Sequence, residues 1–542
     1  MTATLNAKDI ALSFGRTPIL DGVDLTVAPG WRVGLIGPNG VGKSTLLRIC
    51  AGLTRPDRGT VATMPPRALV GYLPQERERR AGERVAEFVA RRTGVADAQQ
   101  ALDAATAALI AGRADAADDY DLALERWLGL GAADLDVRIG EVWADLGLDE
   151  RLVDQDMASL SGGEAARVGL ASLMLSRYEL YLLDEPTNDV DLDGLARLER
   201  WITGLGAGVA LVSHDRTFLA NVVTHVCELD EFTHRAEHFA GGWVAFQTER
   251  ERARQHAWER FESYDTQRRS LASRAQRERE WASQGLSKAK KKPDDNDKGI
   301  KAFKINQTEQ LAGRAARTER AMERLEVVDK PREPWQLRLE IAEAPRSGAI
   351  VARLDGVVVE RGSFRLGPID LTIGFGERVA IVGPNGSGKS TLLGAIVDRV
   401  GPSVVVGEIE QARARIAGEA SVLDIVQRTS GLDVSDTRTL LAKFGLVAGH
   451  VLRPAGSLSP GERTRAMLAL LMAVGTNCLV LDEPTNHLDL PAIEQLEQAL
   501  DGFGGTVLLV THDRSLLDHV RLTRRVELDG GRIVADEPTD GR

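Results

Sequence analysis

The sequence predicts an α/β protein made of two copies of one domain, joined by a long helical segment rich in positive charge. Four short motifs occur twice in the 542 residues, in the same order each time. Apolar, strand-like runs come just before a glycine loop and an acidic pair in both copies. Between the copies, the intervals 243–283 and 300–327 contain a single glycine and no proline, which favours helices.

The composition indicates several domains with apolar cores. The chain is 43% hydrophobic and has a formal net charge of -11. Its start, MTATLNAKDIAL, lacks a basic region followed by an apolar one, so we expect no secretory signal peptide. The apolar run at residues 466–474, AMLALLMAV, is about half a membrane span long and is expected to be a core helix. Cys50, Cys227 and Cys478 share no metal-ligand spacing and indicate thiols in a reducing compartment, which predicts a cytoplasmic protein.

The internal repeat is regular. "GPNGVGKST" at residues 37–45 recurs as "GPNGSGKST" at 383–391, an offset of 346. "LSGGE" recurs as "LSPGE", "LLDEPTN" as "VLDEPTN" and "SHDR" as "THDR", each with an offset of 298. The first copy therefore holds 48 more residues between its first two motifs. This regularity predicts two domains of the same fold.

Each copy begins its motif series with a phosphate-binding loop. An apolar run, VGLIG or VAIVG, leads into the glycine loop, and a helical TLLRI or TLLGA follows it. The glycines allow successive backbone N–H groups to surround phosphates at the start of a helix. Lys43 and Lys389 are expected to reach the β- and γ-phosphates, with Ser44 and Ser390 on Mg²⁺. The predicted loops are Gly37, Pro38, Asn39, Gly40, Val41, Gly42, Lys43, Ser44 and Thr45, and Gly383, Pro384, Asn385, Gly386, Ser387, Gly388, Lys389, Ser390 and Thr391.

An acidic pair ends a second apolar strand in each copy. Asp184 and Asp482 occupy the strand ends, where a carboxylate holds Mg²⁺ directly or through water. Glu185 and Glu483 come next and are placed to polarise an attacking water. Two such strands per copy predict a largely parallel core sheet in each half.

A histidine follows a further apolar strand in each copy. His214 comes after VALVS and His512 after VLLVT. A single histidine is more often packed or solvated than catalytic. Two histidines in matched contexts favour function, and we expect both to contact a γ-phosphate.

Together these motifs resemble the ATP-binding-cassette superfamily, whose hallmark is an LSGGE-type signature between the glycine loop and the acidic strand. The resemblance implies that two cassettes close head to tail, with each ATP between one loop and the signature of the other cassette. Ser161, Gly162 and Gly163 would then cap the ATP on Lys389. Ser459 and Gly461 would cap the ATP on Lys43.

The resemblance also assigns residues outside these motifs. Gln75 and Gln411 match the glutamine that senses metal and water in the superfamily. Phe14 suits the aromatic residue that stacks on adenine. Alignment of the second copy places Glu360 or Arg361 at that position, without an aromatic ring.

Two further positions depart from the pattern. Pro460 replaces the second residue of the signature and removes a backbone N–H. Asp189 stands where the second copy has His487. These differences predict two unequal ATP sites.

The segment between the copies is expected to form a basic two-helix arm. Helices are predicted at about 243–283 and 300–327, separated by a break at Gly285, Pro293 and Gly299. Residues 250–330 hold 21 lysines and arginines against 14 aspartates and glutamates, a net of +7. A 40-residue helix is about 60 Å long, too long to pack fully on one domain. One face is predicted to carry Arg314, Arg317, Arg320 and Arg324.

Two interpretations of this charge remain open. It is either the solvated surface of a coiled coil or an arm that neutralises RNA phosphates. Since RNA helices are recognised mainly through backbone and shape, an arm of this kind needs charge and reach more than a sequence-reading motif.

Two cassettes in one chain without a membrane segment resemble the ABC-F family, ATPases that act on the ribosome. The resemblance implies ATP and Mg²⁺ as cofactors, contacts of the basic linker with ribosomal RNA and tRNA, no membrane insertion, and a monomer. The expected domains are a first ATPase domain at 1–240, a linker at 241–335 and a second ATPase domain at 336–542. An acidic, arm-like insertion is expected at about 96–140, with RNA contact, protein contact and a structural role all open.

The predicted function is that of an ATPase that binds the ribosome in its ATP-closed state. It would protect the ribosome from macrolide-like antibiotics or regulate translation. An alternative is the ATPase subunit of a drug exporter with a separate membrane partner, but such a subunit needs no long basic hairpin. A DNA-repair-type cassette protein is a weaker alternative, because zinc motifs and much longer coiled coils are missing from the sequence.

Overall fold

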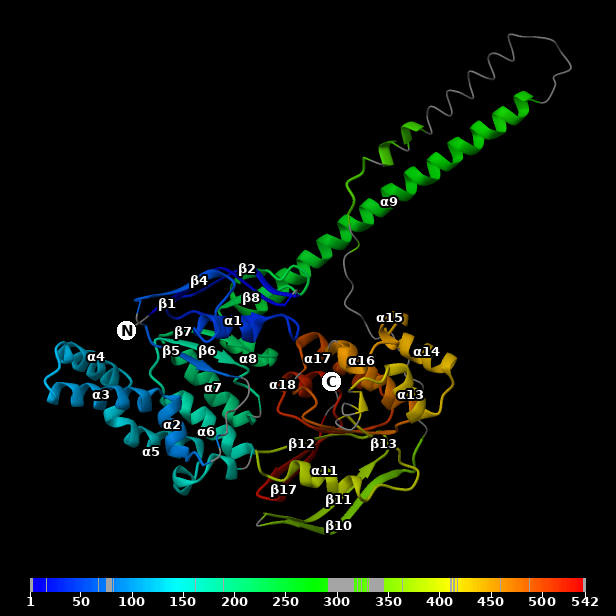
Figure 1. Cartoon of the computed structure of the whole chain (residues 1–542). Coiled ribbons are helices and arrows are strands. Elements are labelled where there is room, and N and C mark those ends of the chain that lie inside the picture. Colours follow the sequence, from blue (N-terminus) through cyan, green and yellow to red (C-terminus); the bar gives the residue numbers. More distant parts are fainter. Residues whose placement is uncertain are drawn as a thin grey trace. The chain divides into compact units, whose positions relative to one another are not determined.

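The computed structural model describes the chain apart from residues 1–2, 16, 67, 75–79, 81, 161, 189, 291–315, 319, 323, 329, 331–345, 363, 410–411, 413–414, 417, 459, 487 and 540–542. It divides into two compact units, Met1–Trp243 with Trp335–Arg542, and Val244–Pro334. The first unit contains both repeats (Figure 1). We call them the first cassette (residues 3–241) and the second cassette (residues 346–539).

Each cassette is built on a six-stranded sheet with the same topology. The strand order is β5-β6-β7-β3-β8-β9 in the first cassette and β13-β14-β15-β12-β16-β17 in the second. The first five strands of each order are parallel, and the last pair is antiparallel. This confirms the predicted α/β fold with two tandem domains. The strands are β3 (Arg32–Ile36), β5 (Val70–Leu73), β6 (Leu180–Asp184), β7 (Gly208–Val212), β8 (His225–Leu229), β9 (Ala236–Ala240), β12 (Arg378–Val382), β13 (Val406–Glu408), β14 (Cys478–Asp482), β15 (Thr506–Val510), β16 (Arg524–Asp529) and β17 (Arg532–Pro538).

A smaller antiparallel sheet accompanies each parallel one. In the first cassette β1 (Thr4–Phe14) lies between β2 (Thr17–Val27) and β4 (Arg58–Met64). In the second cassette β10 (Ile350–Arg361) pairs with β11 (Phe364–Gly374). Alternate residues of these strands are buried in the same apolar clusters as the parallel strands. These sheets therefore share a core with the glycine loops.

Helices cover the sheets and position the motifs. Helices α7, α8, α17 and α18 each begin after an aspartate whose side chain accepts a backbone N–H of the first turn. The helices of the first cassette are α1 (Lys43–Cys50), α2 (Val85–Arg92), α3 (Val95–Ile110), α4 (Ala116–Gly129), α5 (Leu135–Leu146), α6 (Gly162–Leu175), α7 (Leu192–Gly204) and α8 (Arg216–Val222). Those of the second are α11 (Lys389–Val397), α13 (Val422–Ser430), α14 (Val434–Lys443), α15 (Ala448–Val451), α16 (Pro460–Ala473), α17 (Leu490–Asp501) and α18 (Arg514–His519).

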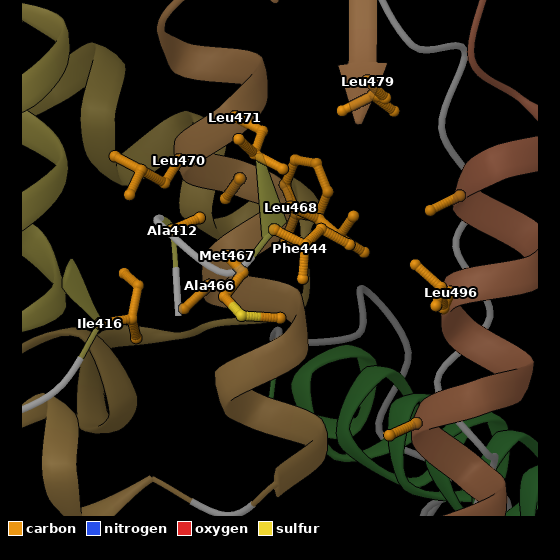
Figure 2. Close-up of a cluster of buried hydrophobic side chains, with 14 of the residues drawn as sticks. Ala412, Ile416, Phe444, Ala466, Met467, Leu468, Leu470, Leu471, Leu479 and Leu496 are labelled. Atoms are coloured by element: carbon orange, nitrogen blue, oxygen red, sulfur yellow. The ribbon is translucent and has the colours of Figure 1, made fainter. Parts of the chain in front are cut away.

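Helix α16 confirms the expected core helix. Residues 466–471 are each at most 6% exposed. Figure 2 shows this stretch among Phe444, Leu479 of β14 and Leu496 of α17. Such a helix is apolar around most of its circumference because the protein surrounds it. Among the described residues, no helix is both long and apolar enough to cross a membrane.

The first cassette contains a helical hairpin within the predicted insertion. Helices α3 and α4 lie side by side (Figure 1). The indole N–H of Trp127 on α4 donates a 2.6 Å hydrogen bond to Gln99 on α3. Ile110, the last residue of α3, is 82% exposed.

The second unit is dominated by one long helix, α9 (Gly242–Lys290), of 49 residues and about 74 Å (Figure 1). The prediction that this helix ends near residue 283, with Gly285 in the break, is wrong, because α9 continues through Gly285 to Lys290. One glycine inside a helix costs only about 1 kcal/mol, which the neighbouring turns offset. Pro293, Gly299 and Arg314 lie outside the described residues. Arg317, Arg320 and Arg324 are exposed.

Within the described residues, contacts at Glu278 and at Trp258 join α9 to the chain that returns from it. The hydroxyl of Thr318 donates a 2.9 Å hydrogen bond to Glu278, whose other oxygen lies 3.1 Å from Arg274 Nε. Glu278 is only 7% exposed, so the bond satisfies a buried carboxylate. Nearer the start of α9, the ammonium of Lys330 lies 5.4 Å from the ring centroid of Trp258.

Candidate functional site

The glycine loops form matching phosphate cradles at the starts of α1 and α11. Gly37 and Gly383 have φ of +143° and +146°, in a region that favours glycine. A Cβ at Gly37 would lie 2.6 Å from the carbonyl oxygen of Leu229, so the loop also needs glycine for space. The residue just before each helix is a glycine, Gly42 or Gly388. The first N–H groups of the helix therefore have no side-chain cap. Such N–H groups bind anions well.

The loop lysines bridge their own loops. Lys43 Nζ donates to the carbonyl oxygens of Gly37 at 2.7 Å and Pro38 at 3.0 Å. Lys389 Nζ donates to Gly383 and Pro384 at 2.9 and 3.0 Å. Burial lowers the pKa of Lys43, and the nearby carboxylates of Glu185 and Asp489 oppose this shift. Both ammonium groups therefore lie over the cradles.

The first cassette brings together two of the predicted metal ligands, Ser44 and Asp184. Asp184 ends β6, and its carboxylate accepts a 3.0 Å hydrogen bond from Ser44 Oγ. Tyr72, which was not predicted from the sequence, lies with its hydroxyl 3.4 Å from the other oxygen of Asp184. A hydroxyl and a carboxylate side by side are hard oxygen donors of the type that Mg²⁺ prefers. These side chains therefore fit Mg²⁺.

The acidic residue after each strand has an unusual backbone. Glu185 has φ of +51° and Glu483 of +45°, in the left-handed region that non-glycine residues rarely adopt. The same conformation in both cassettes indicates that the fold holds the two side chains in place at a cost in strain. Burial, the largest cause, raises the pKa of Glu185 to about 7. A carboxyl with this pKa accepts a proton readily near neutral pH.

Each motif histidine lies against the glutamate and the glycine loop of its own cassette. His214 Nε2 is 3.1 Å from Glu185 Oε1 and 3.2 Å from Asn39 Oδ1. His512 Nε2 is 3.4 Å from Glu483 Oε1 and 3.2 Å from Asn385 Oδ1. Burial is the largest cause that lowers the pKa of His214, to about 3, so this ring is neutral at pH 7.

The glycine loop of each cassette also contacts the other cassette. The backbone N–H of Asn39 donates to Asp489 at 3.1 Å, and that of Asn385 donates to Asp191 at 3.1 Å. The second oxygen of each aspartate caps its own helix, α17 or α7. Sequence reasoning did not single out these aspartates, although their matched positions in NDVD and NHLD were a usable signal.

The signature of the first cassette lies beside the loop of the second. A Cβ added to Gly163 would lie 2.6 Å from Asn385 Cβ. This placement agrees with the head-to-tail arrangement that the resemblance implied. Gly162 and Pro460 begin α6 and α16, and Gly461 is the second residue of α16. The predicted residues Ser161, Ser459, Gln75 and Gln411, and the unequal pair Asp189 and His487, lie outside the described residues.

A pocket of about 310 Å³ adjoins the first glycine loop. Phe14, 64% exposed, lines it together with residues of the loop and acidic motif. Thr485 and Leu488 of the second cassette line it too. The pocket is thus shared between cassettes and has an aromatic residue at its edge. Its remaining lining includes Asn39, Gly40, Gly42, Lys43, Ser44, Thr45, Glu185 and His214.

The second cassette also holds an aromatic ring against its loop. A Cβ at Gly388 would lie 2.7 Å from Cζ of Phe364, the first residue of β11. In the first cassette the aliphatic side chain of Ile19, on β2, lies in the corresponding place beside Gly42, so Phe364 is the counterpart of Ile19. The alignment of Glu360 or Arg361 with Phe14 stays a prediction.

The comparisons with known proteins agree with this arrangement. The family model described as ABC transporter matches residues 20–188 and 366–486. The tylosin resistance ATP-binding protein TlrC of Streptomyces fradiae is 36% identical, covering 95% of each chain. ABC transporter F family member 2 of Arabidopsis thaliana is 30% identical over 98% of this chain and 77% of its own. The energy-dependent translational throttle protein EttA of Mycobacterium tuberculosis is 32% identical over 94% and 89%.

A solved structure shows the same fold. The chain resembles the archaeal ribosome recycling factor aABCE1, crystallised with ribosomal stalk protein aP1, with a TM-score of 0.53 and 19% identity. The match covers 98% of this chain and 91% of that chain. With both cassettes matched and similarity to family F proteins along nearly the whole chain, this protein belongs to the ABC-F family of ATP-binding-cassette proteins.

Proposed function

We propose that the protein is an ATPase that closes its two cassettes on ATP and binds the ribosome in that closed state. In this role it protects the ribosome from macrolide-like antibiotics or regulates translation. The observation that carries the proposal is the extent of similarity. The match runs through the linker as well as the cassettes, to one relative named for tylosin resistance and another named for throttling translation.

The geometry supports ATP-driven closure. In each cassette the loop N–H groups and the lysine bind the phosphates, and the loop also contacts an aspartate of the other cassette. Nucleotide bound at the loop therefore acts on the contact between cassettes. If ATP binds the closed arrangement of the cassettes more tightly than the open one, the difference in binding free energy shifts the equilibrium toward closure.

The chemistry of hydrolysis falls to the paired glutamates and histidines. Glu185 and Glu483 accept the proton of the attacking water. His214, neutral and 3.1 Å from Glu185, orients that carboxyl and contacts the γ-phosphate. Ser44 and Asp184 would hold Mg²⁺, as would Ser390 and Asp482, and the bound ion neutralises phosphate charge.

The double variant Glu185→Gln with Glu483→Gln tests this function. It keeps the shape of both side chains but removes the proton acceptors, so ATP should stay bound. We expect it to co-sediment with ribosomes in ATP and to stay in the supernatant in ADP. Adding Lys43→Ala and Lys389→Ala should abolish sedimentation in both. A chain that pellets equally in ATP and ADP, or in neither, contradicts the ATP-closed state.

The role of the linker requires its own test. Arg317, Arg320 and Arg324 are exposed on the returning segment. If they contact RNA phosphates, changing all three to Gln should reduce the slope of log affinity against log salt by about 2 to 3. The matched control changes Arg353, Arg428 and Arg438, exposed residues of the second cassette, to Gln. An equal effect of both sets would show general charge attraction rather than a linker contact.

A cell-free translation assay separates the two outcomes of binding. Protein that restores translation inhibited by a macrolide acts in protection. Protein that changes the rate of uninhibited translation with ATP but leaves macrolide inhibition unaffected acts in regulation.

A further inference from the structure

Two partly buried arginine–glutamate pairs cross between the cassettes. Arg216, the first residue of α8, contacts Glu497 on α17. Arg514, the first residue of α18, contacts Glu199 on α7. In each pair an arginine of one cassette reaches a glutamate of the other. The two arginines are 298 residues apart and so are the two glutamates, so the pairs are copies of one contact.

The pairs are well shielded from water. The side chains of Arg216 and Glu497 are 15% and 11% exposed, and those of Arg514 and Glu199 are 26% and 14% exposed. A buried ion pair adds little net stability compared with apolar residues. Removing one partner nevertheless strongly disfavours the closed arrangement, because it leaves the other charge shielded from water and alone. The closed arrangement therefore requires both members of each pair.

Acidic residues outnumber basic ones at this contact. Asp215 and Asp513, the residues before the two arginines, cap α8 and α18. Arg514 Nη2 lies 3.8 Å from Asp215 of the other cassette. Burial, and then the nearby charge of Asp513, raises the pKa of Asp215 to about 6. Four carboxylates thus face two guanidinium groups, and without the arginines the two cassettes would present like charges to each other.

The contact lies next to the catalytic residues but outside the nucleotide pocket. Among the described residues, neither the two arginines nor the two glutamates line the 310 Å³ pocket. His214, Asp215 and Arg216 are consecutive, as are His512, Asp513 and Arg514. The arginine that contacts the other cassette is therefore only two residues after the histidine of its own ATP site.

We infer that Arg216–Glu497 and Arg514–Glu199 form a latch that holds the cassettes together without touching nucleotide. The latch sets the concentration of ATP needed for closure, and its arginines are positioning residues. This inference rests on the ATP-driven closure proposed above. The latch depends on charge complementarity. We therefore expect that exchanging the two charges within a pair preserves the latch.

The test measures closure in the full chain by energy transfer between one dye on each cassette. Leu53→Cys and Val534→Cys provide exposed sites, while the native Cys50, Cys227 and Cys478 are buried. A non-hydrolysable ATP analogue is titrated, and binding of a fluorescent ATP analogue is followed separately. Arg216→Glu should raise the analogue concentration for half-closure at least tenfold while nucleotide binding at the loops stays within about threefold. Combining Arg216→Glu with Glu497→Arg should restore the original value to within about threefold.

Two further variants keep the test decisive. Glu497→Gln, with little change in volume, should also raise the half-closure concentration if the reversed variant fails to fold. Arg521→Glu is the matched control, because the Arg521–Asp501 pair lies within the second cassette and is exposed. No shift in Arg216→Glu and Glu497→Gln, or no recovery in the exchanged pair, overturns the latch. A wild-type chain that fails to close on the analogue would contradict ATP-driven closure, whereas the latch still predicts a longer inter-dye distance in nucleotide-free Arg216→Glu.

Discussion

The backbone N–H of Asn39, in the glycine loop of the first cassette, donates a 3.1 Å hydrogen bond to Asp489 of the second cassette. The other oxygen of Asp489 caps α17 through the N–H of Ala492. One carboxylate thus joins the stability of a helix to the contact between cassettes. Asp191 does the same for Asn385 and α7.

Asp489→Asn separates these two roles. Asparagine caps helices about as well as aspartate, so the melting temperature should change little. Its amide group, however, presents a donor to the Asn39 N–H, and the contact between cassettes is lost. We expect a several-fold lower rate of ATP hydrolysis at subsaturating ATP. Asp433→Asn, which changes the cap of α14, is the control and should leave the rate unchanged. Equal rates for Asp489→Asn and the wild type would argue against the role of the contact.

A methyl group at Gly163 should block closure. Its Cβ would lie 2.6 Å from Asn385 Cβ, closer than such atoms approach. Gly163→Ala should therefore reduce ATP hydrolysis at least tenfold while leaving ATP binding at Lys43 intact. Gly169→Ala, on the same helix α6, meets no atom within 4 Å and should stabilise the helix by about 0.5–1 kcal/mol. Steady-state kinetics and thermal unfolding of both variants would show whether the effect belongs to the contact or to the helix.

Removing the charge of Glu185 should stabilise the protein at high pH. Its folded pKa of about 7 exceeds its ordinary value of 4.5, mainly because of burial. Below pH 4.5 the carboxyl is protonated in both states, and its ionisation costs nothing. Between pH 4.5 and 7 the unfolded chain ionises more readily, so stability falls, by up to about 3 kcal/mol above pH 7.

Glu185→Gln should thus unfold at a higher temperature than the wild type at pH 8 and at a similar temperature at pH 4.5. Thermal unfolding across this range measures the difference. Glu87→Gln, an exposed residue, should show no such trend. A difference that does not vary with pH would rule out burial of the charge as its source.

The hydrogen bond between Thr318 and Glu278 should stabilise the second unit. Thr318→Val keeps the shape but leaves the buried Glu278 carboxylate with fewer donors, at a cost of about 1–3 kcal/mol. We expect faster amide hydrogen exchange in α9 around Glu278. Thr248→Val removes an exposed hydroxyl that bonds only the preceding turn of α9 and serves as the control. Unchanged exchange in Thr318→Val would show that the bond contributes nothing to α9.

Local motifs made much of this structure predictable. A glycine loop between a strand and a helix has one stable arrangement. The loop conformation around Lys43 and Lys389 was therefore predictable from the neighbouring residues in the sequence. Contacts between distant parts were not predictable in this way. Asp191, Asp489 and the arginine–glutamate pairs acquire their roles only when the two cassettes meet.

The end of α9 shows a different limit. Gly285 was read as a break because glycine is a poor helix former, but its penalty is small beside the support of a long helix.

The two contacts of the second unit constrain how this part of the chain can change in length. Trp258 and Glu278 both contact the returning chain, which fixes their directions relative to each other on α9, and each residue of a helix turns by about 100°. One residue inserted between them would point Glu278 away from Thr318, whereas seven residues, almost two full turns, would restore the direction. Lengthening with a matched insertion on the returning side would thus proceed in steps of about 10 Å. Among related proteins, the reach of this segment should take discrete values rather than vary continuously.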